Sequence, residues 1–127
     1  MNNKTILVIE GNEVNMKIIR SLLQIGQYQV VEAIDAETGI RLAHENHPDL
    51  ILMDIQLPGM DGLNATKVIK ADDTLKHIPV VALTSYAMQG DEKLALEVGC
   101  VDYITKPLET RSFLGEISKF FNGDGAK

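Results

Sequence analysis

The sequence predicts a single α/β domain built on a doubly wound, five-stranded parallel sheet with five helices. Three observations predict this fold class. Short, wholly apolar runs at 6–9, 50–53 and 80–83 are typical of strands buried on both faces. Segments with helical periodicity separate these runs and imply right-handed crossover connections. The length of 127 residues is close to the commonest size of one domain.

Strands and helices are expected to alternate along the chain. In chain order, the strands lie at 6–9, 28–33, 50–53, 80–83 and 103–104, and the helices at 14–25, 35–45, 64–70, 91–98 and 110–121. The second strand is rich in residues that favour strands, whereas the fifth is weaker. Gly26 and Gly99 end the first and fourth helices. Asp35 and Thr110 are expected to cap the second and fifth, and Pro48 prevents the second from continuing.

The first and last helices carry the clearest amphipathic pattern. In the first helix the apolar residues form one stripe at helical spacing, and they are Val14, Ile18, Ile19, Leu22, Leu23 and Ile25. The fifth helix places four apolar residues on one face, and they are Phe113, Leu114, Ile117 and Phe121. Such stripes are typical of helices that pack one side against a core.

Composition excludes several classes of protein. Apolar residues make up 45% and charged residues 24%, which is ordinary for a globular chain. No apolar run is long enough for a transmembrane helix or a signal peptide, so no membrane partner is expected. A net charge of −6 disfavours binding to nucleic acid. The lone Cys100 excludes an internal disulfide and fits a reducing compartment, so we expect a cytoplasmic location.

Polar residues stand directly after four of the predicted strands, and function in doubly wound sheets lies beyond these strand ends. They are Glu10 and Gly11, Asp54, Thr84 and Ser85, and Lys106 and Pro107. If the first and third strands are neighbours, about 4.8 Å apart, Glu10 and Asp54 converge. Lys106 and Thr84 then close the pocket from the other side.

These residue types suit phosphoryl chemistry. A carboxylate such as Asp54 can attack a phosphoryl group and form an aspartyl phosphate. Such transfer depends mainly on positioning and on neutralising charge. Two carboxylates can hold Mg²⁺, a cation that keeps several of its waters. Lys106 can pair with Asp54 before the reaction and with a phosphoryl oxygen afterwards, and the Thr84 hydroxyl can donate to the same oxygen.

Three motifs in this order resemble the receiver domain of two-component response regulators. They are ILMDIQLPGMDG at 51–62, with Pro58 in the loop, then Thr84–Ser85, and then YITKP at 103–107. The resemblance covers essentially the whole chain. The stretches NEVNM at 12–16 and AMQGDE at 87–92 are most similar to single-domain, DivK-type cell-division regulators. The resemblance implies a flavodoxin-like receiver fold with strand order 2-1-3-4-5, in a domain at 1–122 followed by a short disordered tail at 123–127.

The resemblance also implies a role for each site residue. Asp54 would accept a phosphoryl group from a phosphohistidine on a histidine kinase or phosphotransfer protein. Thr84 and Tyr103 would form the pair that moves on phosphorylation. Lys106 would contact the phosphate, and its peptide bond to Pro107 would be cis.

The metal site departs from the family pattern at one position. Family members usually carry two acidic residues after the first strand, the second of which binds Mg²⁺ directly. This chain has Glu10 followed by Gly11, so the direct ligand is absent. The remaining ligands implied by the family are Glu10, Asp54 and the backbone carbonyl of Gln56. We therefore expect Mg²⁺ binding to be weakened or lost.

These observations predict a stand-alone receiver that signals by phosphorylation-dependent protein binding, with no DNA-binding or enzymatic output of its own. Its downstream target would bind the face formed by the fourth helix, fifth strand and fifth helix, where Tyr86, Met88 and Tyr103 cluster. Because the chain begins with Met1 and completes the fold, an intact small protein is favoured over a receiver excised from a hybrid histidine kinase.

Two other functions compete with this prediction. Gly11 favours a pseudo-receiver, which would bind partners constitutively without being phosphorylated. A small phosphatase or nucleotide-binding protein is disfavoured, because an aspartate-based phosphatase needs a second acid where Gln56 stands. No G-x-G-x-x-G follows the first strand, and no P-loop motif occurs in the sequence.

Overall fold

The strands and helices alternate strictly along the chain in the computed structural model, which describes residues 4–57, 59–85 and 90–122. The strands are β1 (Thr5–Ile9), β2 (Gln29–Ala33), β3 (Leu50–Asp54), β4 (Val80–Ser85) and β5 (Asp102–Lys106). The helices are α1 (Glu13–Ile25), α2 (Ala36–Asn46), α3 (Gly62–Ala71), α4 (Asp91–Glu97) and α5 (Thr110–Asn122).

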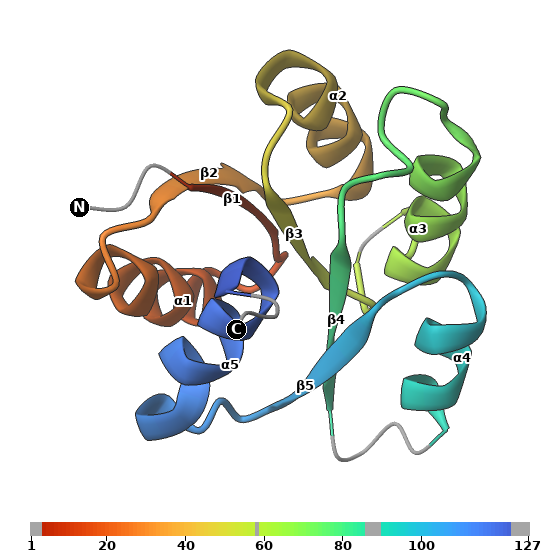
Figure 1. Cartoon of the computed structure of the whole chain (residues 1–127). Coiled ribbons are helices and arrows are strands. Elements are labelled where there is room, and N and C mark those ends of the chain that lie inside the picture. Colours follow the sequence, from red (N-terminus) through yellow and green to blue (C-terminus); the bar gives the residue numbers. More distant parts are fainter. Residues whose placement is uncertain (1–3, 58, 86–89, 123–127) are drawn as a thin grey trace.

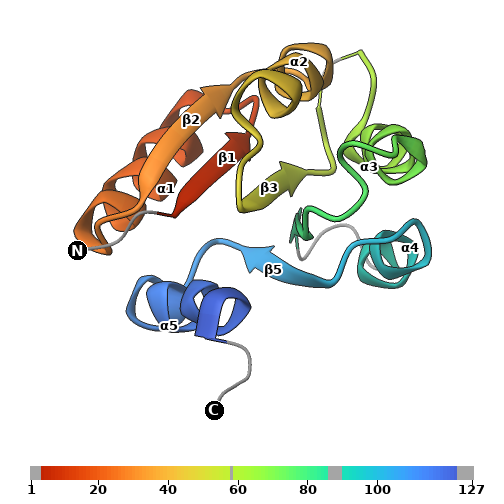
Figure 2. The same cartoon turned by 45° about the horizontal axis from the view of Figure 1, so that its top comes forward.

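The strands form one parallel sheet in the order β2-β1-β3-β4-β5, which confirms the expected fold class. Helices α1 and α5 cover one face of the sheet, and α2, α3 and α4 cover the other (Figure 1). The same three layers are visible from a second direction, where α2, α3 and α4 line one side of the sheet (Figure 2). All five strands therefore point their carboxyl ends towards one edge of the molecule.

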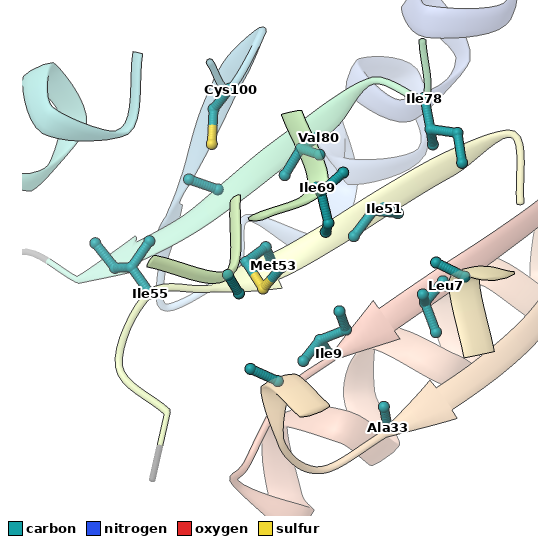
Figure 3. Close-up of a cluster of buried hydrophobic side chains, with 14 of the residues drawn as sticks. Leu7, Ile9, Ala33, Ile51, Met53, Ile55, Ile69, Ile78, Val80 and Cys100 are labelled. Atoms are coloured by element: carbon teal, nitrogen blue, oxygen red, sulfur yellow. The ribbon is translucent and has the colours of Figure 1, made fainter. Parts of the chain in front are cut away.

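The core lies on both sides of the sheet because successive strand residues alternate between its faces. In β1, Leu7 and Ile9 pack under α2 and α3, whereas Ile6 and Val8 pack under α1 and α5. The first of these clusters also takes in buried side chains from β3, β4 and α3 (Figure 3). All four of these β1 side chains are fully buried, so the predicted two-faced burial of the apolar runs is correct.

Helix α1 does not bury the whole stripe that the sequence predicts. Val14 and Ile25 are 65% and 71% exposed, and Ile18 is also exposed. The buried face instead consists of Met16, Ile19 and Leu23. The sequence is apolar on two adjoining sides of this helix, and only its packing on the sheet decides which side is covered.

The boundaries of all five strands differ from the prediction by one or two residues, and β2 and β5 show why. Strand β2 begins at Gln29, and the Tyr28 ring packs against Phe121 with centroids 5.5 Å apart. Strand β5 extends from Asp102 to Lys106 because its residues pair with β4 along this length. Charged residues at both ends concealed this strand in the sequence, since pairing in the sheet overrides their weak strand preference.

Helix ends were also misplaced by one or two residues. Helix α3 begins earlier than predicted because the Asp61 side chain accepts a hydrogen bond from the Asn64 backbone N–H at 2.8 Å. Helix α5 already includes Thr110, and the Glu109 carbonyl accepts the N–H groups of Ser112 and Phe113. The prediction that Thr110 caps this helix is therefore wrong by one position.

Some residues named in the sequence analysis lie outside the described part of the chain. They are Met1, Pro58, residues 86–89 with Tyr86 and Met88, and the tail at 123–127. Among the described residues, no helix has the length and apolar character needed to cross a membrane.

Asp35 caps α2 and makes the stability of the fold depend on pH. Its side chain accepts the Thr38 backbone N–H at 2.8 Å, and hydrogen bonds from Thr38 hold the pKa of Asp35 below its usual value. A depressed carboxyl pKa stabilises the fold above the unfolded value of about 3.9, and this contribution disappears as pH falls through the folded pKa.

We expect Asp35→Ala to lower the thermal midpoint by a few degrees near neutral pH, because α2 loses its cap. The difference from the unaltered protein should shrink as pH falls from about 3.9, the unfolded value, through the lowered pKa of Asp35 in the folded protein. Thermal unfolding followed by circular dichroism at a series of pH values measures both effects. Asp35→Asn is the matched control, since asparagine keeps the capping oxygen but does not titrate. If the difference in thermal midpoint between Asp35→Ala and the unaltered protein stayed constant with pH, the contribution of the Asp35 charge to stability would be contradicted.

Candidate functional site

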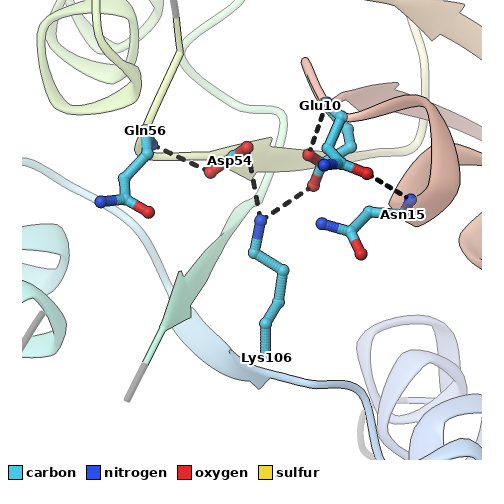
Figure 4. Close-up of polar contacts among 6 residues, drawn as sticks. Glu10, Asn15, Asp54, Gln56 and Lys106 are labelled. Carbon is cyan, nitrogen blue, oxygen red and sulfur yellow. Dashed lines mark hydrogen bonds and ion pairs between the residues drawn. The ribbon is translucent and has the colours of Figure 1, made fainter. Parts of the chain in front are cut away.

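Three charged side chains from separate strand ends meet at the carboxyl edge of the sheet (Figure 4). Glu10 directly follows β1, Asp54 ends β3, and Lys106 ends β5. Strands β1 and β3 are neighbours, with Ile9 opposite Met53, so the next residues on each strand are Glu10 and Asp54. Because β1 and β3 are neighbours in the sheet, both carboxylates lie side by side at its carboxyl edge.

Lys106 joins the two acids. Its Nζ lies 3.2 Å from Glu10 Oε1 and 3.4 Å from Asp54 Oδ2. Both carboxylates are buried, and the Lys106 side chain is 15% exposed. Buried charges are stable in a fold only when they are paired and hydrogen-bonded, and the ammonium group provides this pairing for both acids.

Backbone N–H groups bind the other oxygen of each carboxylate. Asn12 N donates to Glu10 Oε2 at 3.0 Å, and Gln56 N donates to Asp54 Oδ1 at 2.9 Å. Burial and the neighbouring Asp54 raise the pKa of Glu10, whereas the Asn12 N–H and the Lys106 ammonium act in the opposite direction. The backbone N–H groups of Asn12 and Gln56 and the Lys106 ammonium therefore fix the positions of the two carboxylates.

Local interactions fix the conformation of the two loops that flank the site. Asn12 caps α1, because its side-chain oxygen accepts the Asn15 backbone N–H at 2.9 Å. After β3 the chain folds back on itself, and Gly62 N donates to the Ile55 carbonyl at 3.2 Å. A Cβ at Gly62 would lie 2.6 Å from Ile55 Cα, so only glycine allows this close approach beside Asp54.

These residues surround an open, polar cleft of about 390 Å³, which is lined by Glu10, Gly11, Asn12, Asn15, Asp54, Gln56 and Lys106. Neither Asn12 nor Asn15 was predicted to be a site residue from the sequence. The sequence did contain a signal for Asn12, since an asparagine directly before a helical pattern is typical of an N-cap. That Asn15, one helical turn later, also reaches the cleft depends on the orientation of α1.

Thr84 and Tyr103 are not among the residues that line this cleft. Thr84 is 1% exposed near the end of β4, and its hydroxyl has no hydrogen-bond partner in the described part of the chain. Tyr103 is exposed on β5 and lines a separate surface pocket with Pro107 and Glu109. The Lys106–Pro107 peptide bond is cis.

The oxygen donors of the cleft suit a hard cation that keeps most of its waters. Two carboxylates, Glu10 and Asp54, line it, and the described residues contain no cluster of three or more acidic, histidine or cysteine side chains suited to a metal. Gly11 lines the cleft without contributing a side chain. Among the described residues, the glycines with a positive φ are Gly59, Gly90 and Gly99, and Gly11 is not one of them. Its backbone therefore does not require glycine.

Comparison with known proteins agrees with this geometry. The family described as "Response regulator receiver domain" matches residues 6–118. The polar-differentiation response regulator DivK of Brucella ovis is 45% identical over 95% of this chain and 98% of its own length. The DivK of Brucella anthropi is equally similar.

Solved structures share the fold. The receiver domain of a Pseudomonas aeruginosa sensor histidine kinase, with a magnesium ion coordinated in its active-site cleft, is 33% identical. It covers 96% of this chain and 100% of its own, with a TM-score of 0.88. The receiver domain of Saccharomyces cerevisiae Ssk1, crystallised with the phosphotransfer protein Ypd1, gives a TM-score of 0.84 at 28% identity, covering 93% and 88%. This chain belongs to the response regulator receiver family.

Proposed function

We propose that the chain is a signalling switch that accepts a phosphoryl group on Asp54 and signals by phosphorylation-dependent binding to another protein. One observation carries this proposal: the Asp54 carboxylate opens onto a polar cleft and is paired with Lys106 at 3.4 Å. The donor would be a phosphohistidine on a histidine kinase or phosphotransfer protein. The complex of the related Ssk1 receiver with Ypd1 supports a partner of this class.

In the transfer, one Asp54 oxygen attacks the phosphorus atom of the phosphohistidine. A phosphorus–oxygen bond forms while the phosphorus–nitrogen bond breaks, and the imidazole nitrogen keeps the electron pair. Lys106 neutralises the charge that spreads over the phosphoryl oxygens. Gln56 N, which donates to Asp54 Oδ1, holds the carboxylate in one orientation during the attack.

Mg²⁺ would be held by Glu10, Asp54 and the backbone carbonyl of Gln56. When bound, it supplies positive charge to the phosphoryl oxygens. The magnesium ion in the related Pseudomonas receiver supports this assignment. Gly11 offers no side-chain ligand, so we propose that this chain binds Mg²⁺ weakly and is phosphorylated slowly at millimolar Mg²⁺.

Thr84 and Tyr103 are proposed to turn phosphorylation into a change of surface. The buried Thr84 hydroxyl, which has no partner in the described residues, would donate to a phosphoryl oxygen. Movement of Thr84 leaves space into which Tyr103 can turn. Leu94 and Leu96 are exposed on α4, and Val101 is exposed just before β5. The exposed apolar residues of these elements support a role for this face in binding a target.

We expect the beryllofluoride mimic of phosphate to shift backbone amide resonances in α4, β5 and α5 as well as around Asp54. The new hydrogen bond from Thr84 gives the differential contact that a population shift requires. Two-dimensional NMR of the labelled protein measures the shifts, and Thr84→Val, which keeps the shape but removes the hydroxyl, is the control. Shifts confined to the Asp54 loop would contradict the proposed switch.

A pseudo-receiver is the second candidate function. The observation in its favour is the combination of Gly11 with the Lys106 ion pairs to Glu10 and Asp54, which neutralise the cleft without a metal. Incubation with a phosphorylated phosphotransfer protein, with and without MgCl₂, separates the two candidates. Label transferred to this chain supports the switch, and no transfer under either condition supports the pseudo-receiver.

A further inference from the structure

The side-chain amide of Asn15 lines the polar cleft beside Asp54 and makes no hydrogen bond within the described residues. It is the third residue of α1, and its backbone N–H is already bound by the Asn12 side chain. Its side-chain amide points from α1 towards the space between Glu10 and Lys106 (Figure 4). Neither amide atom has a hydrogen-bond partner within the described residues, although the side chain lines the cleft.

The Asn15 amide can supply an additional oxygen ligand to the cleft. Gly11, four residues earlier, lines the same cleft but contributes no side chain to it. The cleft therefore has two carboxylates where a divalent cation would accept further oxygen ligands. Amide oxygens of asparagine are hard donors of the kind that such cations bind, either directly or through their waters.

We propose that the Asn15 amide oxygen contacts Mg²⁺, or one of its waters, and compensates in part for the missing side chain at Gly11. This inference rests on the proposed function, because it requires that the cleft bind Mg²⁺. It assigns Asn15 a role in positioning the cation, while Glu10 and Asp54 provide the charge.

A purely structural role for the Asn15 side chain has little support in the fold. The cap of α1 uses the Asn12 side chain and the Asn15 backbone, and both remain when the Asn15 side chain is shortened. Asparagine is a poorer helix former than alanine. Asn15→Ala should therefore fold with a thermal midpoint that is equal to or above that of the unaltered protein.

The chain offers a matched control. Asn64 is also the third residue of its helix, α3, and its backbone N–H is likewise bound by the capping side chain, Asp61. Asn64 is exposed and is not among the residues that line the cleft. Asn64→Ala makes the same substitution at the same helical position without touching the candidate metal site, and in addition it removes the 3.4 Å hydrogen bond from Asn64 Nδ2 to Asp61 Oδ2.

The test is a titration with MgCl₂, followed by calorimetry or by amide chemical shifts, on six proteins. They are the unaltered chain, Asn15→Ala, Asn15→Asp, Asn64→Ala, Gly11→Asp, and Gly11→Asp combined with Asn15→Ala. In the unaltered background, Asn15→Ala should weaken binding about tenfold, the lower range for groups that support a metal ligand. Asn15→Asp should strengthen it, and Asn64→Ala should leave it unchanged. In the Gly11→Asp background the effect of Asn15→Ala should fall below about twofold, because a carboxylate then takes the same place.

Two results would overturn the inference while leaving the proposed function intact. One is equal Mg²⁺ affinity in Asn15→Ala and the unaltered chain. The other is a loss of affinity that is just as large with Gly11→Asp, which would make Asn15 a support for Lys106 or Glu10 instead. If the unaltered chain shows no saturable Mg²⁺ binding and Gly11→Asp does, the proposed metal role of this chain fails together with the inference.

Discussion

Replacing Asp54 with asparagine should abolish phosphorylation, with incorporation of label at least about 100-fold below that of the unaltered chain. Among the described residues, Asp54 alone combines the strand-end position with contacts to Lys106 and Gln56 N. The amide of asparagine is not a nucleophile, so the step that forms the phosphorus–oxygen bond is lost. Transfer from a small phosphodonor or a phosphorylated phosphotransfer protein, read by mass spectrometry, measures the effect.

Asp61→Asn is the control for this experiment. Asp61 lies in the same loop, but its side chain caps α3, and asparagine preserves the capping oxygen. The control should be phosphorylated as well as the unaltered chain. Undiminished phosphorylation of Asp54→Asn would place the acceptor elsewhere, and thermal unfolding of both variants excludes loss of the fold as the cause.

Restoring an acidic residue with Gly11→Asp should raise Mg²⁺ affinity at least about tenfold. The gross attraction gained is several kcal/mol, since a pair of unit charges 4 Å apart contributes about 4 kcal/mol at an intermediate dielectric constant. Water that fills the position in the unaltered chain offsets most of this gain. The backbone at Gly11 has no positive φ angle that would resist the new side chain. A calorimetric titration with MgCl₂ measures the change, and phosphorylation at millimolar Mg²⁺ should become faster.

The same variant should lose stability when no metal is present. A third carboxylate beside Glu10 and Asp54 adds repulsion that Lys106 cannot fully neutralise, because that lysine already pairs with both acids. The thermal midpoint should fall without Mg²⁺ and recover in part when Mg²⁺ is added.

Gly115→Asp is the control that separates the effect of a carboxylate placed in the cleft from the effect of an added negative charge anywhere on the protein. It adds the same negative charge on α5, where a Cβ meets no atom within 4 Å. This control should change neither the Mg²⁺ affinity nor the response of the midpoint to Mg²⁺. Equal affinity in Gly11→Asp and the unaltered chain would mean that Glu10, Asp54 and the Gln56 carbonyl suffice to bind Mg²⁺ without the second acidic side chain.

Patterns within a few residues were sufficient to predict the sheet. The apolar runs around Leu7, Ile51 and Val81 can be satisfied only by strands with two buried faces, and all three residues are completely buried. The same local patterns indicated that Asp54 and Lys106 stand at strand ends. Glu10 and Gly11 were recognisable as an unusual pair only through the resemblance to receiver domains, which usually carry two acidic residues after the first strand.

Contacts between distant segments were decided by tertiary structure. Lys106 and Glu10 are 96 residues apart in the chain, and only the strand order brings Nζ within 3.2 Å of Oε1. The exposure of Val14 and the orientation of Asn15 both depend on how α1 rotates against the sheet. Local sequence encodes how a segment folds, because strand and helix periodicities arise within the segment itself. Which face of a segment is covered, and which charges meet, depends on packing between segments that the chain connects only through the complete fold.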